Sequence, residues 1–333
     1  MTEKTHAANV TVGVVGLGLM GSSIVVSLLL AGHGVIAIAP IAGELDVAPR
    51  RISQQLKFCE NDGLLKEPAE HYLAFLTISE NYELLDHCEL ILECVVEKIE
   101  VKNAVYQKIT SACYPDAIIA TNTSAIPISV LQQLVSFPDR FIGIHWAEPA
   151  FATRFMEIVC GDQTSPETAD KVCQLAYLWG KEPTVLRKDI RGFITNRLMY
   201  AVYREAFALV EAGSVAMTDV DKSFRYDEGS WMTCMGIFRR MDLMGLEDYW
   251  EVFGRLFPQL TNTDRVPSVM EALVREKAGG TQDMKGLYSY TRQEAARWGD
   301  AFARFTKDIY ELASRYPASV RETEVKGNLV DRS

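Results

Sequence analysis

The chain has 333 residues, of which 48% are hydrophobic and 23% are charged, and it carries a formal net charge of -10. This composition is ordinary for a globular protein, and the length is sufficient for two domains with cores of their own. The acidic balance argues against general binding to nucleic acids or anionic membranes, although a local basic patch could still hold a phosphorylated ligand.

The seven cysteines are scattered, and no two of them have the C-x-x-C spacing. An odd number without that spacing argues against a disulfide framework and against a zinc site, so we expect no metal. Buried thiols in a reducing cytoplasm are the simplest interpretation. We find no signal peptide, and the longest apolar run, Ile24 to Ala31, is too short to cross a bilayer.

The N-terminal region carries a dinucleotide-binding pattern. A strand-like run, Val10–Val15, leads into G-x-G-x-x-G, and an apolar helix follows through Ala31. The glycines permit a tight turn, close approach of the backbone to a pyrophosphate, and close packing of helix on strand, while the helix N-terminus attracts the phosphates. The expected cofactor-binding residues of this loop are Gly16, Leu17, Gly18, Leu19, Met20 and Gly21.

One element of this pattern is missing. The second strand-like run, Val35–Ile38, ends in Ala39 and Pro40, where an Asp or Glu normally holds the adenosine ribose hydroxyls. The first acid downstream is Glu44, and Arg50 or Arg51 could approach a ribose 2′-phosphate. The sequence therefore favours NAD, leaves NADP open, and predicts only modest discrimination between the two.

Short apolar runs alternate with helical patterns over the first 188 residues, which is typical of an α/β Rossmann-like, doubly wound parallel sheet. In such sheets ligands bind beyond the carboxyl ends of the strands. The expected strands are Val10–Val15, Val35–Ile38, Leu90–Val96, Ala117–Thr121, Arg140–His145, Met156–Cys160 and Thr184–Leu186, and the clearest helices are Met20–Ala31, Arg50–Asn61, Val101–Cys113, Ile128–Leu134 and Pro166–Leu178.

After about Lys188 the strand pattern stops and the remainder indicates an all-α C-terminal domain, so we expect domains at 1–188 and 189–333, with a frayed tail from Pro317. The predicted helix Gly192–Ala212 is apolar on most of its circumference. More than one of its faces must be covered, and we expect the helical substrate domain to form a homodimer interface. Further helices are expected at Leu246–Phe257, Pro267–Lys277 and Trp298–Arg315.

Four polar residues stand in otherwise apolar or glycine-marked segments: Ser124, His145, Glu157 and Asn196. An unpaired charge in a buried strand costs several kcal/mol or more, so we expect His145 and Glu157 to pair. A paired imidazole and carboxylate can exchange a proton near neutral pH. The set therefore predicts an acid/base site.

These segments together resemble the 3-hydroxyacyl-CoA dehydrogenase family over nearly the whole chain. The resemblance implies that His145 is the general acid/base at the substrate 3-oxygen while the nicotinamide exchanges a hydride with C3, and that Glu157 orients the imidazole. It also implies that Ser124 and Asn196 hydrogen-bond the reacting oxygen or the thioester carbonyl. Glu97 and Lys102 would contact the nicotinamide half of the cofactor. The matching segments are Gly16–Gly21, Glu93–Lys98, Thr121–Ser124, Gly143–His145, Glu157–Val159, Gly192–Arg197, Met235-Gly236, Asp242–Leu246 and Lys285–Tyr288.

Several departures from the family pattern concern residues expected to contact the substrate or the cofactor. Glu148 stands where the family has Asn, and Gln55 and Asp62 stand where its serine and lysine contact CoA. The leading hypothesis is an oxidoreductase for L-3-hydroxyacyl-CoA. A dehydrogenase of a free 3-hydroxy acid, with Arg154 as the carboxylate-binding candidate, is the alternative. A non-catalytic cofactor-binding protein is a third, which retention of the four polar residues disfavours.

Overall fold

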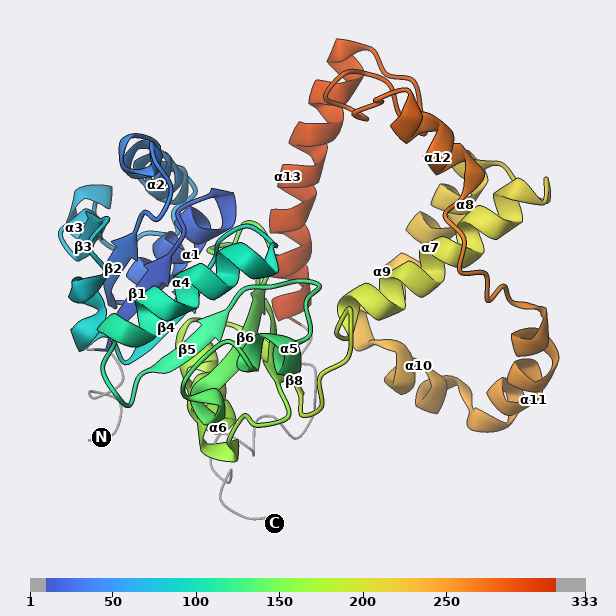
Figure 1. Cartoon of the computed structure of the whole chain (residues 1–333). Coiled ribbons are helices and arrows are strands. Elements are labelled where there is room, and N and C mark those ends of the chain that lie inside the picture. Colours follow the sequence, from blue (N-terminus) through green and yellow to red (C-terminus); the bar gives the residue numbers. More distant parts are fainter. Residues whose placement is uncertain (1–9, 316–333) are drawn as a thin grey trace. The chain divides into compact units, whose positions relative to one another are not determined.

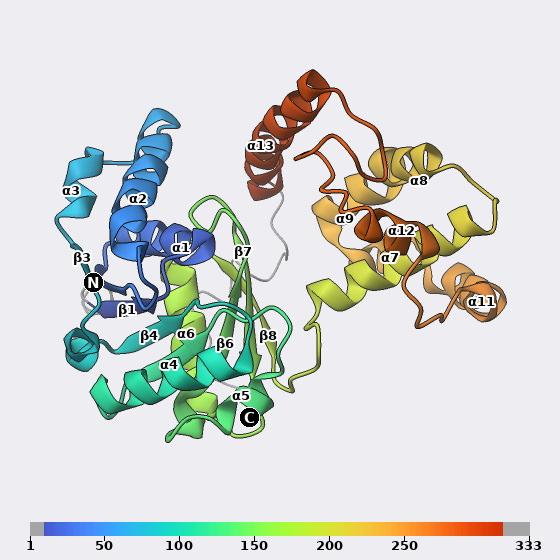
Figure 2. The same cartoon turned by 45° about the horizontal axis from the view of Figure 1, so that its top comes forward.

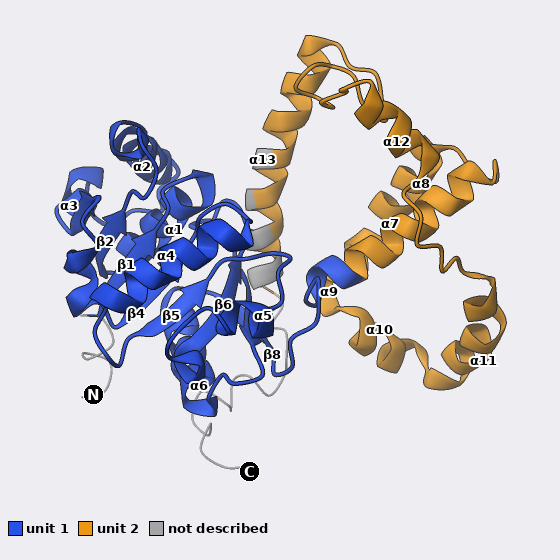
Figure 3. Ribbon diagram, viewed as in Figure 1, with its two compact units in different colours: residues 1–197 blue, residues 198–333 orange. Residues whose placement is uncertain are grey.

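The computed structural model describes residues 10–315, so the expected tail from Pro317 lies outside the described residues. The chain divides into two compact units, residues 1–197 and 198–333 (Figure 3). The first contains a sheet flanked by helices and the second is helical, which confirms the predicted fold class (Figure 1). Within the described residues, no helix is both long and apolar enough to cross a membrane.

The first unit is built on an eight-stranded sheet in the order β3-β2-β1-β4-β5-β6-β7-β8. The strand order reverses between β1 and β4, and a ligand crevice is expected beyond their carboxyl ends. Strands β1 to β6 are parallel to one another, whereas β7 pairs antiparallel with β6, and β8 follows the direction of β7. The strands are β1 Thr11–Val15, β2 Gly34–Ile38, β3 Leu76–Ser79, β4 Leu90–Glu93, β5 Ile118–Thr121, β6 Phe141–Trp146, β7 Phe155–Cys160 and β8 Glu182–Leu186.

Helices cover both faces of this sheet (Figures 1 and 2). One apolar core joins one face to α1, α2 and α6, and a second core joins the other face to α4 and α5. Strands buried on both faces are continuous apolar runs rather than alternating ones, which is why the sequence reveals most of them. The helices are α1 Leu19–Leu30, α2 Glu44–Asn61, α3 Ala69–Leu73, α4 Ile99–Ala112, α5 Ile128–Gln132 and α6 Pro166–Leu178, with 3₁₀ turns at Tyr82–His87 and Pro138–Arg140.

Two differences from the predicted elements affect the crevice. Strand β3 was not expected, because it is a four-residue edge strand that is nowhere fully buried. Helix α2 begins at Glu44 rather than at Arg50, and it includes Pro49. Proline lacks an N–H, so Pro49 leaves the carbonyl of Leu45 without its helical donor, but the helix continues through it. The earlier start places Glu44 in the first turn of α2.

The second unit consists of amphipathic helices. Among its described side chains, none is buried, although large apolar residues are abundant on its helices. Its helices are α7 Thr195–Glu211, which begins within the last residues of the first unit, α8 Met217–Ser223, α9 Gly229–Met235, α10 Ile237–Met244, α11 Leu246–Leu256, α12 Ser268–Arg275 and α13 Arg292–Ser314, with a π-helical turn at Phe224–Glu228 and a 3₁₀ turn at Phe257–Gln259.

Candidate active site

His145 and Glu157 face each other across two neighbouring strands. They are register partners in the antiparallel pairing of β6 and β7, and His145 Nδ1 lies 2.8 Å from Glu157 Oε2. The Glu157 side chain is fully buried, whereas the His145 side chain remains 15% exposed. The expected pairing is therefore present, with its carboxylate in the protein interior and its imidazole reaching the surface of the first unit.

The second oxygen of Glu157 is also satisfied. Oε1 accepts the backbone N–H groups of Ile194 at 3.0 Å and Thr195 at 2.9 Å, and Thr195 begins α7. Burial alone would raise the pKa of Glu157, but the hydrogen bonds from His145 and from these amides hold it below its ordinary value. An anionic Glu157 stabilises a protonated imidazole.

This arrangement selects the tautomer of His145. Because ionised Glu157 can only accept, Nδ1 carries the proton in the pair, and Nε2 is left to accept a proton from a ligand. The ring is held by two phenylalanines, Phe155 at 5.6 Å and Phe193 at 5.7 Å between centroids. Phe193 has φ 53° and is fully buried. Left-handed backbone at a bulky residue is strained, and such strain clusters at functional sites.

Ser124 and Asn196 also lie together. Asn196 Nδ2 donates to the backbone oxygen of Ser124 at 3.2 Å, and the Ser124 side chain is exposed. Nearby, Asn122 Oδ1 accepts the N–H of Trp146 at 2.9 Å, which ties the segment after β5 to the end of β6. Within the first unit, Ser124 follows β5, His145 and Glu157 are paired in β6 and β7, and Asn196 lies in the first turn of α7.

Glu97 and Lys102 belong to a charge cluster in which Lys102 is buried and Glu97 is exposed. Lys102 Nζ donates to both oxygens of Glu93, at 2.8 and 2.9 Å, and lies 3.3 Å from Glu97. These contacts use its three donors, and its side chain is only 1% exposed. Glu97 also accepts from Thr123 and from the N–H of Ala125. Lys102 therefore fixes Glu97 rather than presenting its own ammonium to a ligand.

Burial alone would raise the pKa of Glu97, but the hydrogen bond from Thr123 and the charge of Lys102 hold it below its ordinary value. The centre of the cluster, Glu93, was not singled out from the sequence. It also accepts from Tyr106 and Thr121, both at 2.8 Å. A carboxylate that ends an otherwise apolar strand was the available signal, because such a group must find partners.

The glycine loop fits a nucleotide. A Cβ on Gly21 would lie 1.8 Å from the carbonyl oxygen of Gly16, and a Cβ on Gly18 would point into open space. Gly18 caps α1, whose first turn has neither a side-chain cap nor an acid. Its N–H groups are thus available to an anion. The described residues contain no group of His, Cys, Asp and Glu that could hold a metal ion.

Two family models match this chain. Residues 11–190 match the NAD binding domain of 3-hydroxyacyl-CoA dehydrogenase, and residues 192–290 match its C-terminal domain. The 5-formyl-3-hydroxy-2-methylpyridine 4-carboxylate 5-dehydrogenase of Mesorhizobium japonicum is 31% identical over 85% of this chain and 91% of its own length. An L-carnitine dehydrogenase from a Pseudomonas species is 30% identical over 88% and 90%.

Among solved structures, a 5-formyl-3-hydroxy-2-methylpyridine 4-carboxylic acid 5-dehydrogenase, described as an NAD⁺ dependent dismutase, superposes with a TM-score of 0.83. It is 27% identical, and the match covers 91% of this chain and 98% of that one.

Proposed function

The chain belongs to the 3-hydroxyacyl-CoA dehydrogenase family of NAD-dependent oxidoreductases, and on that premise we propose that it oxidises and reduces a small free hydroxy acid. The single observation that carries the chemistry is the pair of His145 Nδ1 and Glu157 Oε2 at 2.8 Å, which leaves Nε2 available. In oxidation, Nε2 takes the proton of the substrate hydroxyl, and Glu157 stabilises the resulting imidazolium. Ser124 and Asn196 hydrogen-bond the reacting oxygen or the substrate carbonyl.

Bound NAD⁺ would accept the hydride from the carbon that bears this hydroxyl. The residues that fit the cofactor are the loop Gly16–Gly21, with the first-turn N–H groups of α1 for the pyrophosphate, and Glu97 for the nicotinamide half. Lys102 acts on the cofactor through Glu97, because its own donors are engaged.

The preference for a free acid is supported by the surface of α2. Arg51, one of its few basic residues, donates from Nη1 to the carbonyl oxygen of Leu17 at 2.7 Å and is therefore engaged in the glycine loop. Gln55 and Asp62 stand where the family pattern has serine and lysine toward CoA. The relatives named above are also dehydrogenases of a pyridine carboxylate and of carnitine. CoA brings several phosphate charges, which need local Lys or Arg.

The CoA thioester remains the second candidate, because the matching family models describe 3-hydroxyacyl-CoA dehydrogenase and the exposed Arg50 and Lys57 remain on α2. The two are separated by comparing kcat/KM for acetoacetyl-CoA with a panel of free 3-oxo and 3-hydroxy acids that includes L-carnitine. We expect at least about tenfold higher kcat/KM for one of the free acids. Faster turnover of the CoA thioester than of every free acid would contradict the proposal.

Arg154, the carboxylate-binding candidate from the sequence, forms an ion pair with Glu182 at the start of β7 and β8. Both side chains are about half exposed, so the pair is weak and a substrate carboxylate could compete for the guanidinium. Arg154→Ala should raise KM for the free acid and leave NADH affinity unchanged. An unaltered KM would remove Arg154 from the site.

We also propose a homodimer formed through the helical unit. The first unit encloses its own cores, whereas every described side chain of the second unit is at least partly exposed. Large apolar residues are exposed there, including Phe238 at 82% and Trp250 at 77%. Exposed apolar surface on this scale marks an interaction site, and most oligomers of a single chain are twofold symmetric dimers.

A further inference from the structure

The end of β2 lacks the acid that holds the adenosine ribose in dinucleotide-binding folds. The carbonyl oxygen of Ile38, the last residue of β2, accepts the N–H of Gly16 at 2.9 Å, so the strand end touches the first glycine of the loop. The next residue, Ala39, is buried, and Pro40 has no N–H. A ribose beside the loop finds no side-chain acceptor at this position.

Glu44 reaches the same loop from a different element. Its Oε1 accepts the N–H of Leu17, which lies between the first two glycines, at 3.2 Å. Its backbone N–H donates to the carbonyl oxygen of Ile41 at 3.1 Å, which closes the turn after β2 and returns the chain toward the strand end. The carboxylate of Glu44 therefore lies against the glycine loop.

The second carboxylate oxygen of Glu44 lacks a donor. Oε2 is buried from solvent and has no hydrogen-bond partner among the described residues. A buried acceptor without a donor is destabilising. Burial accordingly raises the pKa of Glu44, although the N–H groups of Leu17 and Ile41 and the charge of Arg51 act in the opposite direction. A hydroxyl that binds beside the glycine loop would supply the missing donor.

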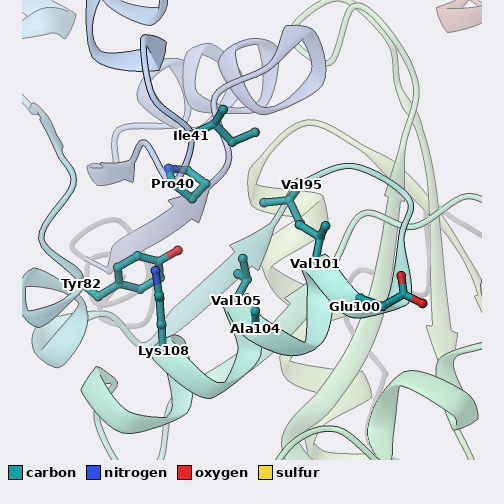
Figure 4. A pocket seen from close by; sticks show the side chains of 9 residues that line it. All are labelled: Pro40, Ile41, Tyr82, Val95, Glu100, Val101, Ala104, Val105 and Lys108. Carbon is teal, nitrogen blue, oxygen red and sulfur yellow. The ribbon is translucent and has the colours of Figure 1, made fainter.

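A pocket of about 340 Å³ borders this position at the carboxyl ends of β2 and β4. Figure 4 shows Pro40 and Ile41 on one side, Val95 opposite them, and the ring of Tyr82 at the end nearest Lys108. The carbonyl oxygen of Ile41, a lining residue, accepts the backbone N–H of Glu44, so the start of α2 adjoins this pocket. Apolar walls of this kind suit a flat aromatic base.

We propose that Glu44 accepts a hydrogen bond from the 2′-hydroxyl of the adenosine ribose, substituting for the acid absent at Ala39. This contact would make the protein selective for NAD(H) over NADP(H), whereas the sequence alone predicted only modest discrimination. A carboxylate at this position gains the ribose hydroxyls and repels a 2′-phosphate. Arg51 is the residue that could attract a 2′-phosphate, but its guanidinium already donates to the carbonyl oxygen of Leu17. The inference rests on the nucleotide-binding part of the proposed function and is independent of the substrate.

The test is the ratio of the dissociation constants of NADPH and NADH, measured by fluorescence titration of the full-length protein without substrate. We expect a ratio of about 100 or more for the wild type and about 10 or less for Glu44→Gln, with weaker NADH binding and tighter NADPH binding. Asp46→Asn is the matched control. Asp46 is an exposed carboxylate in the same first turn of α2, so this variant removes the same charge and should keep the wild-type ratio.

The ratio separates recognition from a structural role. If Glu44 only holds the loop through Leu17, Glu44→Gln weakens both nucleotides equally, and the proposal is overturned. Equal affinity of the wild type for NADH and NADPH, or an equal change of ratio in Asp46→Asn, would also overturn it. A protein that binds neither nucleotide would refute the proposed dehydrogenase function together with this inference, whereas an unexpected substrate would leave the inference intact.

Discussion

The two units differ in how completely they bury their own apolar surface. The sheet of the first unit is covered on both faces, and its charged groups, such as Glu93, Lys102 and Glu157, are buried with partners. The helices of the second unit have no buried side chain among those described. Close packing fixes the rotamers that acid/base chemistry requires, and the proposed catalytic groups lie in the first unit. The exposed helical faces need a second surface, which a partner copy can provide.

The sharpest test of this difference removes the proposed acid/base residue from the first unit and leaves the second unit unchanged. His145→Ala should lower turnover roughly 10²–10⁴-fold, because proton transfer loses its base. The dissociation constant of NADH and the oligomeric state should remain those of the wild type, measured by fluorescence titration and light scattering. Unchanged turnover would show that the acid/base group lies elsewhere.

Replacement of Glu157, the partner of the imidazole, should have the next largest effect on turnover. Glu157→Gln should lower turnover about 10²-fold, because the amide cannot stabilise the imidazolium by charge. It should also alter acid stability. The folded pKa of Glu157 is below its ordinary value of 4.5, so the stability that this carboxylate contributes is present above about pH 4.5 and is lost as the pH falls through the folded pKa.

Urea unfolding of both proteins at pH 7 and at pH 4 measures this second effect. The gap in unfolding free energy between wild type and Glu157→Gln should be smaller at pH 4. A gap that does not depend on pH would contradict the assignment of a depressed carboxylate pKa.

The contrast between the two units also predicts that the helical unit forms the dimer interface. We expect a dimer at micromolar concentration, and we expect Trp250→Asp or Phe238→Asp to weaken it about 30-fold or more, the effect of losing a single interface hot spot. Sedimentation equilibrium gives the dimer dissociation constant. Phe75→Asp, which changes a residue of the first unit with 52% exposure, is the control. A monomeric wild type would refute the interface.

The smallest effect concerns a buried cation of the first unit. Lys181 is 3% exposed, donates to the carbonyl oxygens of Ala150 and Thr153, and lies 5.2 Å from the ring centroid of Trp146. Burial lowers its pKa from 10.5 to about 8. Between these values the unfolded chain binds more protons than the folded one, so the free energy of unfolding should rise with pH.

We expect a rise of about 1 to 2 kcal/mol in the unfolding free energy of the wild type from pH 8 to 10. Lys181→Met lacks the titrating group and should show a smaller rise over the same range. Parallel pH profiles of the two proteins, measured by urea unfolding, would contradict the lowered pKa of Lys181.

Features that depend on residue type and pattern within short segments were predicted correctly from the sequence. The glycine loop before α1 and the continuous apolar runs of the central strands predict the sheet, because burial on both faces leaves no polar alternation. The pairing of His145 and Glu157 was expected because two charged groups in buried strands need partners, and the two residues are register partners in β6 and β7. The catalytic roles assigned to the four polar residues stay predictions.

Signals that depend on distant segments were missed or incomplete. The edge strand β3 has too few buried residues to produce a pattern. The helix predicted at Arg50–Asn61 begins earlier, at Glu44, and includes Pro49. The sequence also could not show that the three donors of Lys102 are engaged by Glu93 and Glu97.

The sequence by itself determined the fold class, the glycine loop and the pairing of His145 with Glu157, because each depends on residue type and spacing within a few turns or strands. The tertiary structure decided which groups meet. Glu44 returns to Leu17 across 27 residues, and Asn196 reaches the backbone of Ser124 across 72. Such contacts are set by the packing of whole helices on a sheet, which residue spacing does not encode. The candidate ribose acceptor therefore became visible only when the loop and the first turn of α2 were seen together.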